Sequence, residues 1–419
     1  MSEWKEVRLG DLCYKVCSGG TPKSTCSAYY AGGTIPWLNT KEINYNRIVK
    51  TESHITEEGM NNSSAKWIDA NAVVVAMYGA TAGRVAIAKV PMTTNQACCN
   101  LMIDSSKANY EFIYYYLSNN YKHLLSMANG AAQQNLNAQV IKDYNISLPC
   151  LDEQHRIASI LSSLDSKIEC NRKICANLEA QAQALFKHWF IDFAPFKDGK
   201  FVESELGRIP EGWRVGTYGD IIKETISGDW GKDTPEGNYT HRVACIRGCD
   251  FQDVKMGLRG KTPERFILEK NFQSKHFEDK DVLVEISGGT ATVSTGRVCP
   301  VSQLLIDKYD GDIVCTNFCR LVRPQKGYSS YLYYSWKYKY DRKVMFGYEN
   351  GTSGIKNFSI KDFTAREPLI VPVPSAIKEF ENMIEHIHTQ IQNCGSETAK
   401  LAQLRDTLLP KLMSGQIKL

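Results

Sequence analysis

The chain repeats itself, because one ordered series of landmarks occurs twice along its 419 residues. Trp4-Lys-Glu-Val-Arg-Leu-Gly-Asp-Leu returns as Trp213-Arg-Val-Gly-Thr-Tyr-Gly-Asp-Ile, a separation of 209 residues. Thr94-Asn95 returns as Thr316-Asn317, and the proline that closes each copy, Pro149 or Pro372, recurs 223 residues later. Chance similarity between apolar segments explains such an ordered series poorly. A duplicated chain of this length is therefore expected to fold as two similar units.

Each copy has the pattern of a mixed α/β domain of about 150 residues. Short β-branched and aromatic runs lie between clusters of Gly, Asn, Ser and Thr, which is typical of strands joined by turns. A tyrosine-rich helix follows the strands of each copy. The predicted strands are Ala72–Tyr78, Cys98–Ile103, Asp281–Ile286 and Phe318–Val322, and the predicted helices are Glu111–Asn119 and Ser329–Tyr338.

A long helix is predicted after each α/β copy, because apolar residues recur there at heptad spacing. The residues of this helix–helix seam are Leu161, Leu164, Ile168, Leu178, Leu185, Ile384, Ile387, Ile391, Leu401 and Leu408. Asn171 and Thr398 interrupt the seam and are expected to set its register. Residues 152–190 would extend about 58 Å at ~1.5 Å per residue, which suits a spacer between domains. The second helix is expected to return antiparallel to the first; the alternative is that each helix packs on its own domain.

These patterns define the expected architecture. We predict an α/β protein in which two pseudo-repeated mixed α/β domains are joined by two long antiparallel coiled-coil helices. The predicted boundaries are residues 1–150 for the first domain, 151–190 for the spacer helix, 191–212 for a linker, 213–373 for the second domain and 374–413 for the C-terminal helix.

Composition restricts the function only weakly. The net charge of +4 and the pI near 8.3 permit nucleic-acid binding without indicating it. No apolar run reaches the roughly 18 residues needed to span a membrane, and the first residues are charged, so a cytoplasmic location without membrane contact is expected. The fourteen cysteines show no second Cys or His pair at a zinc-binding distance. They are interpreted as reduced thiols that act as small hydrophobes, with no metal.

No catalytic motif is recognisable in the sequence. A P-loop, a GxSxG elbow and an HExxH helix are all missing, as is the Asn/Asp-Pro-Pro-Tyr/Phe segment of amino-methyltransferases. His386 and His388 are two residues apart on a predicted helix, so they point to different faces and are expected to be solvated. We therefore predict no catalytic residues and no cofactor in this chain.

Three segments resemble the specificity subunits of Type I restriction–modification systems. They are Gln133-Gln-Asn-Leu-Asn through Leu164-Asp165, Glu205-Leu-Gly-Arg-Ile-Pro-Glu-Gly-Trp213, and Leu401-Ala-Gln-Leu-Arg-Asp-Thr-Leu-Leu-Pro-Lys-Leu412 with the following Met-Ser-Gly-Gln-Ile417. The resemblance covers essentially the whole chain. The second long helix departs from it, because it opens Pro374-Ser-Ala-Ile-Lys-Glu where the first has Asp152-Glu-Gln-His-Arg.

The resemblance implies a division of labour among subunits. Each recognition domain would read one half of a split, asymmetric double-stranded DNA target, and the helices would fix the unread gap. Two methyltransferase subunits would supply S-adenosylmethionine and the base-flipping pocket, and restriction subunits would supply ATP- and Mg-dependent translocation and cleavage. Inserting one heptad in the Leu161–Trp189 helix should then lengthen the gap or abolish activity without changing either half-site.

Candidate DNA-contacting residues come from predicted loops that hold side chains able to bond base edges. Arginine matches guanine, and asparagine or glutamine matches adenine. A solvated loop side chain is the alternative for each of them. The candidates are Thr40, Lys41, Thr81, Arg84, Gln133, Gln134 and Asn135 in the first copy, and Arg247, Thr290, Thr292, Arg297, Lys356 and Asn357 in the second.

Two other functions compete with DNA specificity. A stand-alone DNA-modifying enzyme would transfer methyl groups from S-adenosylmethionine without a partner. A coiled-coil scaffold whose globular halves bind proteins would protect no DNA, whereas a specificity subunit must protect two separated patches.

Overall fold

The computed structural model describes residues 4–127, 135–290, 292–351 and 356–419, which divide into two compact units. Unit 1 comprises Met1–Ser166 together with Leu401–Leu419, and unit 2 comprises Lys167–Lys400. The two long helices, α5 (Leu151–Phe190) and α11 (Pro374–Met413), each contribute one end to each unit.

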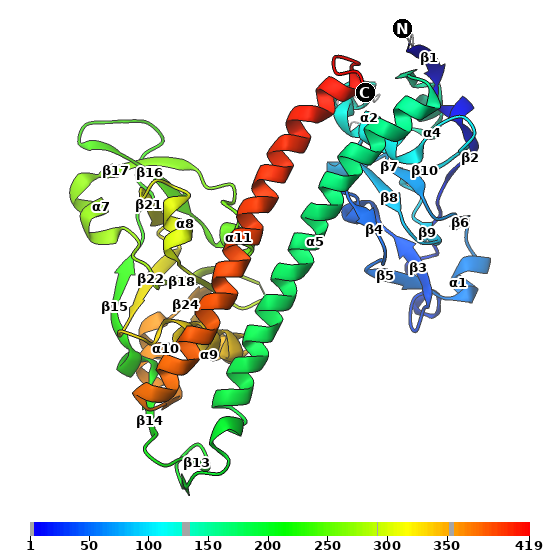
Figure 1. Ribbon diagram of the computed structural model, residues 1–419. Coiled ribbons are helices and arrows are strands. Elements are labelled where there is room, and N and C mark those ends of the chain that lie inside the picture. The colour runs from blue at the N-terminus through cyan, green and yellow to red at the C-terminus, as the bar shows by residue number, and fades with distance from the viewer. Residues whose placement is uncertain (1–3, 128–134, 291, 352–355) are drawn as a thin grey trace. The chain divides into compact units, whose positions relative to one another are not determined.

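Unit 1 is built on a five-stranded sheet in the order β2-β10-β7-β8-β4 and a four-stranded sheet in the order β5-β3-β9-β6 (Figure 1). A third, two-stranded sheet pairs β1 with β11. The strands and short helices are β1 (Lys5–Arg8), β2 (Cys13–Ser18), β3 (Ile35–Leu38), β4 (Arg47–Ile48), β5 (Ser53–Ile55), α1 (Glu57–Asn61), β6 (Trp67–Ile68), β7 (Ala72–Ala76), β8 (Val85–Ala88), β9 (Met92–Thr94), β10 (Cys98–Ile103), α2 (Tyr110–Asn119), α3 (Tyr121–Ser126), α4 (Ala138–Asp143) and β11 (Asn145–Leu148).

Unit 2 has a four-stranded sheet β15-β22-β18-β20, a three-stranded sheet β17-β16-β21 and a three-stranded sheet β19-β24-β23. Two further pairs are β14 with β25 and β12 with β13. Its elements are β12 (Phe201–Val202), β13 (Ile209–Pro210), β14 (Arg214–Thr217), β15 (Ile222–Ser227), β16 (Tyr239–Ile246), α6 (Phe251–Lys255), β17 (Glu264–Leu268), α7 (Glu269–Lys275), β18 (Val282–Glu285), β19 (Ser287–Gly289), β20 (Val298–Pro300), α8 (Gln303–Asp307), β21 (Ile313–Cys315), β22 (Cys319–Pro324), α9 (Ser329–Asp341), β23 (Glu349–Asn350), β24 (Lys356–Phe358), α10 (Ile360–Arg366) and β25 (Pro368–Val371).

The two units share one topology, which is the structural form of the sequence repeat. The order β2-β10-β7-β8 in unit 1 corresponds to β15-β22-β18-β20 in unit 2, and β5-β3-β9 corresponds to β17-β16-β21. The parallel pair in the second sheet recurs as well, with Trp37 opposite Thr93 in one unit and Ala244 opposite Ile313 in the other. The predicted mixed α/β repeat with two long helices is confirmed.

Apolar runs form the central strands because both faces of the main sheet are covered. All residues of β7 and β10 are buried, which explains why they read as continuous rather than alternating apolar segments. One face of the unit 1 sheet packs on the tyrosine-rich helix α2, where Phe112 and Tyr115 join a core with Val73. In unit 2 the equivalent helix α9 places Tyr331, Tyr334 and Trp336 in a core with Val282.

The long helices pack both on their units and on each other. In unit 1, Ile157 and Leu161 of α5 share a core with Leu412 of α11. In unit 2, Asn171 donates a hydrogen bond to Glu397 Oε2 at 2.8 Å, and Cys175 Sγ lies 3.7 Å from the Ile391 carbonyl oxygen. Rising numbers on α5 therefore meet falling numbers on α11, so the helices run antiparallel. Both arrangements considered from the sequence are therefore present, because the helices pack antiparallel on each other and also pack on the domains.

The predicted seam residues differ in burial. Leu161, Ile168, Ile384 and Ile391 are buried, whereas the other six, Leu164, Leu178, Leu185, Ile387, Leu401 and Leu408, are half-buried. The two polar interruptions, Asn171 and Thr398, are both buried.

Residues 191–212 form more structure than a linker pattern indicates. Phe193 and Phe196 pack edge-on against Trp213, and β12 and β13 form a short antiparallel hairpin. Aromatic contacts therefore hold this segment against the end of α5. Among the residues that the structure describes, no helix has the length and apolar character required to cross a membrane.

Candidate nucleic-acid interface

A cluster of loops lies at one end of the main sheet of unit 1. The carboxyl ends of β2 and β7 meet the amino end of β10, since Cys99 pairs with both Ser18 and Val75. The loop after β3 joins the same end, because Asn95 donates its backbone N–H to the Leu38 carbonyl at 2.9 Å. Leu136 reaches it too, through a 3.0 Å bond to the Met77 carbonyl. We call this group, residues 39–46, 77–84, 94–97 and 135–137, loop cluster 1.

Unit 2 has the same arrangement, which we call loop cluster 2 (residues 247–250, 286–290, 292–297, 316–318, 349–351 and 356–357). Thr316 donates its N–H to the Ile246 carbonyl at 3.0 Å. Ile286 bonds the Phe318 carbonyl at 2.9 Å, and Phe358 bonds the Ile286 carbonyl at 2.9 Å. Each cluster is thus assembled from segments far apart in sequence by equivalent backbone contacts.

Both clusters depend on a glycine packed against a neighbouring loop. An added Cβ at Gly19 would overlap the Thr94 carbonyl oxygen, and one at Gly228 would overlap the Thr316 carbonyl oxygen. Because Gly has no Cβ, the backbones can approach this closely. The two glycines follow equivalent strands, so the close approach belongs to the repeat.

The predicted contact residues of the first copy lie in loop cluster 1. Arg84 donates to Asn44 Oδ1 at 3.0 Å, and Lys41 pairs with Glu52 at 2.7 Å with both side chains about two-thirds exposed. Thr40 and Thr81 are half-buried, and Asn135 is exposed. Gln133 and Gln134 lie outside the described residues.

The predicted residues of the second copy lie in loop cluster 2. Ser287 of β19 faces Asn357 of β24, and Gly289 faces Lys356, so the strand that precedes Thr290 and the segment 356–357 are neighbours despite their separation in sequence. Thr290, Thr292 and Asn357 are exposed. Lys356 pairs with Glu349 at 3.0 Å.

The two predicted arginines of the second copy already bind carboxylates within the unit. Arg247 forms a two-pronged contact with buried Asp250, with Nε–Oδ2 at 2.9 Å and Nη2–Oδ1 at 3.1 Å. Arg297 likewise grips buried Glu285, with Nε–Oε2 at 2.7 Å. The hydrogen bonds that Arg297 donates to Glu285 raise the pKa of Arg297. These pairs brace the loops, and they leave each guanidinium with fewer free donors for a base.

The Glu285–Arg297 pair supports a stability prediction. Glu285→Gln should lower the free energy of unfolding by about 1–2 kcal/mol, because a buried carboxylate loses a charge-assisted pair with a guanidinium that is itself part-exposed. Arg297→Ala should cost a similar amount, and the double variant should cost less than the sum. Urea denaturation measures all three. Strictly additive losses would contradict the pairing, and Glu52→Gln, which breaks an exposed pair, should change stability by less than ~0.5 kcal/mol.

Other residues of the clusters were missed from the sequence. By their backbone bonds, Asn95, Gln96 and Ala97 in cluster 1 correspond to Thr316, Asn317 and Phe318 in cluster 2, and Phe318 is 64% exposed. The recurring Thr-Asn pair was visible as a landmark of the repeat, so its position in both copies was the signal. Asn44 was also missed; it follows a predicted contact loop but gave no separate signal.

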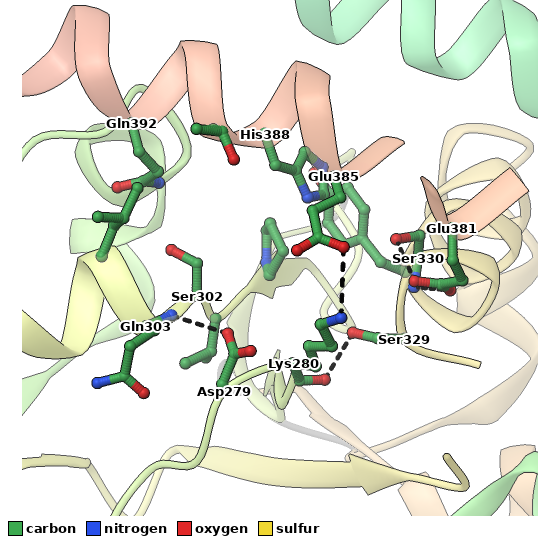
Figure 2. A pocket seen from close by; sticks show the side chains of 15 residues that line it. Asp279, Lys280, Ser302, Gln303, Ser329, Ser330, Glu381, Glu385, His388 and Gln392 are labelled. Carbon is green, nitrogen blue, oxygen red and sulfur yellow. Dashed lines mark hydrogen bonds and ion pairs between the residues drawn. The ribbon is translucent and has the colours of Figure 1, made fainter. Parts of the chain in front are cut away.

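A polar cavity of about 150 Å³ lies beside α11 in unit 2, away from the predicted contact residues (Figure 2). Glu381 accepts bonds there from the N–H groups of Ser330 and Tyr331, at 2.6 and 3.2 Å, and so caps α9. Burial raises the pKa of Glu381 although these bonds oppose the shift. Glu385 pairs with Lys280 at 3.6 Å. The polar groups of the cavity thus attach α11 to the body of unit 2.

The two histidines of α11 differ. His386 is exposed, but His388 is half-buried beneath α9, with Nε2 2.9 Å from Tyr334 Oη. Burial lowers the pKa of His388 to about 4, so it is neutral at physiological pH. The expectation that both histidines are solvated is wrong for His388, because the helix–domain contact covers it.

The cysteines and acidic residues form no metal centre in the described part of the chain, where no group of three or more His, Cys, Asp or Glu could hold an ion. Every cysteine is a free thiol. Seven are buried: Cys98, Cys99, Cys175, Cys245, Cys299, Cys315 and Cys319. Burial raises the pKa of Cys245 and Cys319 to about 12, so these thiols stay protonated and unreactive.

Comparison with known proteins shows which class of protein this chain resembles. Residues 1–180 match the Type I restriction modification DNA specificity domain. The MjaIX Type I restriction enzyme specificity subunit of Methanocaldococcus jannaschii is 28% identical over 428 residues, covering 99% of this chain and 94% of the relative. The HindI specificity subunit of Haemophilus influenzae is 21% identical over 483 residues and covers both chains completely.

The fold agrees with these sequence matches. The crystal structure of a Type I restriction–modification S subunit from M. genitalium superimposes with a TM-score of 0.55 at 18% identity, covering 98% of this chain and 96% of that one. Over nearly its whole length the chain is similar in sequence, and similar in fold, to Type I restriction–modification specificity subunits.

Proposed function

We propose that this chain directs a Type I restriction–modification complex to a split, asymmetric double-stranded DNA target. Loop cluster 1 reads one half-site and loop cluster 2 reads the other. The observation that carries the proposal is that the repeat places two loop clusters at equivalent ends of equivalent sheets, with different side chains in each. Equivalent placement suits two reading heads of one design, and different side chains suit two different half-sites.

The exposed side chains of the clusters fit base recognition in the major groove. Asn135 and Asn357 carry amides that can pair with adenine, and Arg84 carries a guanidinium that can pair with guanine. Exposed Phe318 offers an apolar surface for a thymine methyl group. Lys41, with its side chain about two-thirds exposed, is suited to a phosphate, which positions a domain without specifying sequence.

The chemistry of the complex resides in its partners in this proposal. Two methyltransferase subunits carry S-adenosylmethionine, and restriction subunits use ATP and Mg. The chain itself holds no cofactor and carries out no catalytic step. Its place of action is the cytoplasm, where host DNA is accessible.

Methylation profiling of the host, with and without this gene, tests the proposal. We expect one bipartite motif to lose its methylation when the gene is removed and to regain it on complementation. Unchanged methylation at every motif would contradict the proposal. Incubating the purified chain alone with DNA and S-adenosylmethionine tests the stand-alone enzyme, for which methyl transfer without a partner would be decisive.

A paired insertion tests whether the helices set the gap between the half-sites. Seven residues added to α5 after Asn171 and seven to α11 before Glu397 keep the contact between these two residues in step, because the helices run antiparallel. Seven helical residues add about 10 Å, the length of about three base pairs. We expect a gap longer by that amount, or loss of DNA binding where the turn of the duplex cannot be matched, with both half-site sequences unchanged. Methylation profiling reads the result, and an altered half-site would contradict the division of labour.

A further inference from the structure

Asp165 of α5 connects three separate elements within unit 1. Its carboxylate accepts hydrogen bonds from Tyr115 Oη of α2 at 2.6 Å, from Arg47 Nη1 of β4 at 3.0 Å and from Arg405 Nη1 of α11 at 2.8 Å. Arg47 also donates to Tyr115 Oη at 2.8 Å. The side chain of Asp165 is only 10% exposed. One carboxylate thus ties the sheet and its tyrosine-rich helix to both long helices; we call this contact joint 1.

Joint 1 is charged. Burial alone would raise the pKa of Asp165, but the bonds from Tyr115, Arg405 and Arg47 lower it below its usual value. Burial opposes the shift, but the contacts of Arg47 with Tyr115 and Asp165 raise its pKa, and the bonds of Arg405 to Asp165 and Asp406 raise the pKa of Arg405. Two guanidinium groups therefore share one ionised carboxylate at neutral pH.

The repeat locates the equivalent contact in unit 2, which we call joint 2. His388 lies 223 residues after Asp165, the separation that relates the two long helices. Tyr334 is the sixth residue of α9, as Tyr115 is the sixth residue of α2, and it contacts His388 at 2.9 Å. Lys255 follows β16 as Arg47 follows β3, nine residues after the strand ends.

The geometry of the two joints matches, whereas their charges do not. The guanidinium of Arg47 lies 5.5 Å from the Tyr114 ring centroid, and the ammonium of Lys255 lies 6.0 Å from the equivalent Tyr333 ring. In joint 2 the carboxylate comes from Glu179 of α5, which accepts from the Tyr333 and Tyr334 hydroxyls at 3.2 Å each. The position equivalent to Arg405 is Ala182, which is fully buried. The carboxylate of each joint therefore lies on α5, and α11 supplies an arginine in one joint and a neutral histidine in the other.

We propose that Asp165 is a positioning residue that orients the first recognition domain on the helix pair for reading its half-site, and that the uncharged His388 contact does the same work for the second domain. The proposal rests on the proposed function.

The test uses the full chain in complex with the methyltransferase of its host and a duplex carrying the motif found by methylation profiling. Binding is measured to the intact duplex and to duplexes with either half-site scrambled. Asp165→Asn keeps the shape of the side chain and removes its charge. We expect it to reduce discrimination at the first half-site about tenfold, the effect of ~1.4 kcal/mol, while discrimination at the second stays within about twofold. The first half-site is the one that Arg84→Ala affects.

Three more variants distinguish positioning from a general loss of structure. Arg405→Gln removes only the α11 donor and should give a smaller loss at the same half-site. Combined with Asp165→Asn it should lower discrimination little further than Asp165→Asn alone, because both changes break the same bond, while Arg405 keeps Asp406 and Arg47 keeps Glu111 as counter-charges. Glu169→Gln is the matched control on the same helix, since its carboxylate is 56% exposed and pairs only loosely, at 3.8 Å, with Lys173. It should change neither half-site.

The outcomes distinguish this proposal from the proposed function. If the wild-type complex binds equally well with either half-site scrambled, the proposed function fails, and the positioning role fails with it. If the wild type reads both half-sites and Asp165→Asn reads both as well, or weakens both equally, the positioning role is overturned and the function stands.

Discussion

Gly395→Val is expected to lower the free energy of unfolding of unit 2 by about 3 kcal/mol, an overpacking cost at the upper end for a single side chain. Gly395 of α11 lies against the backbone of Gly257, and an added Cβ would overlap its carbonyl carbon and oxygen. Gly257 has a φ of +73° and faces the backbone of Ile391 and Gln392, so it has no room to retreat. Lys308 secures the contact by donating to the Gly257 carbonyl at 2.6 Å and to Gln392 Oε1 at 2.7 Å.

A Gly395→Ala variant distinguishes the close approach of Gly257 from the general effect of glycine on helix stability. Alanine is favoured over glycine inside a helix by about 1 kcal/mol, so Gly395→Ala would stabilise α11 if the close approach did not matter. We expect Gly395→Ala to be destabilising as well, although less than valine. Asn393→Val, on the exposed side of the same helix, is the matched control and should change stability by less than ~1 kcal/mol. Urea denaturation of the full chain provides the measurement. A Gly395→Ala variant more stable than wild type would contradict the account.

Acidification should destabilise unit 2 through His388. Its pKa is about 4 in the folded protein and ~6.5 in an unfolded chain, so above pH 6.5 the residue is neutral in both states. Between pH 6.5 and 4 the unfolded state binds a proton that the folded state does not, and stability falls. The full shift corresponds to a loss of about 3 kcal/mol, complete near pH 4.

His388→Gln isolates this contribution from that of other groups. Tyr333 and Tyr334 of α9, Glu179 of α5 and Lys255 of α6 surround the histidine and remain in the variant. We expect wild type and variant to differ most at pH 7 and to converge, or to reverse their order, as the pH approaches 4. Thermal unfolding across this range measures the difference. Parallel pH profiles would show that His388 is not buried as a neutral side chain. His386→Gln, at an exposed position, should leave the profile unchanged.

The sequence predicted the architecture because the patterns that encode it are local or periodic. Continuous apolar runs predict the covered strands β7 and β10, and β10 begins and ends at the predicted residues. Heptad spacing predicts α5 and α11, each of 40 residues. The ordered landmarks of the repeat predict that strands such as β7 and β18 occupy the same place in the two sheets.

Contacts between distant residues could not be predicted in the same way. Arg405 is separated from Asp165 by 240 residues, so nothing in either local pattern indicates that the two share a joint. His388 reads as a solvent-facing helical histidine until α9 is placed over it. From the sequence alone, Gly395 is a residue that destabilises a helix, and only the close approach of Gly257 explains why a glycine lies there.

The candidate interface was predicted in outline. Loop composition indicated residues such as Arg84 and Asn357, which the fold brings into the two clusters. It could not indicate that Arg247 and Arg297 are braced by carboxylates, because that depends on where Asp250 and Glu285 point. Contact of any of these residues with DNA stays a prediction.

Footprinting shows whether each loop cluster reads its own half-site. The full chain, in complex with the methyltransferase of its host, is bound to a duplex that carries the bipartite motif. We expect two protected patches separated by an unprotected gap. Arg84→Ala should weaken one patch, and Asn357→Ala should weaken the other. A single continuous patch, no protection, or both variants weakening the same patch would contradict the proposed function.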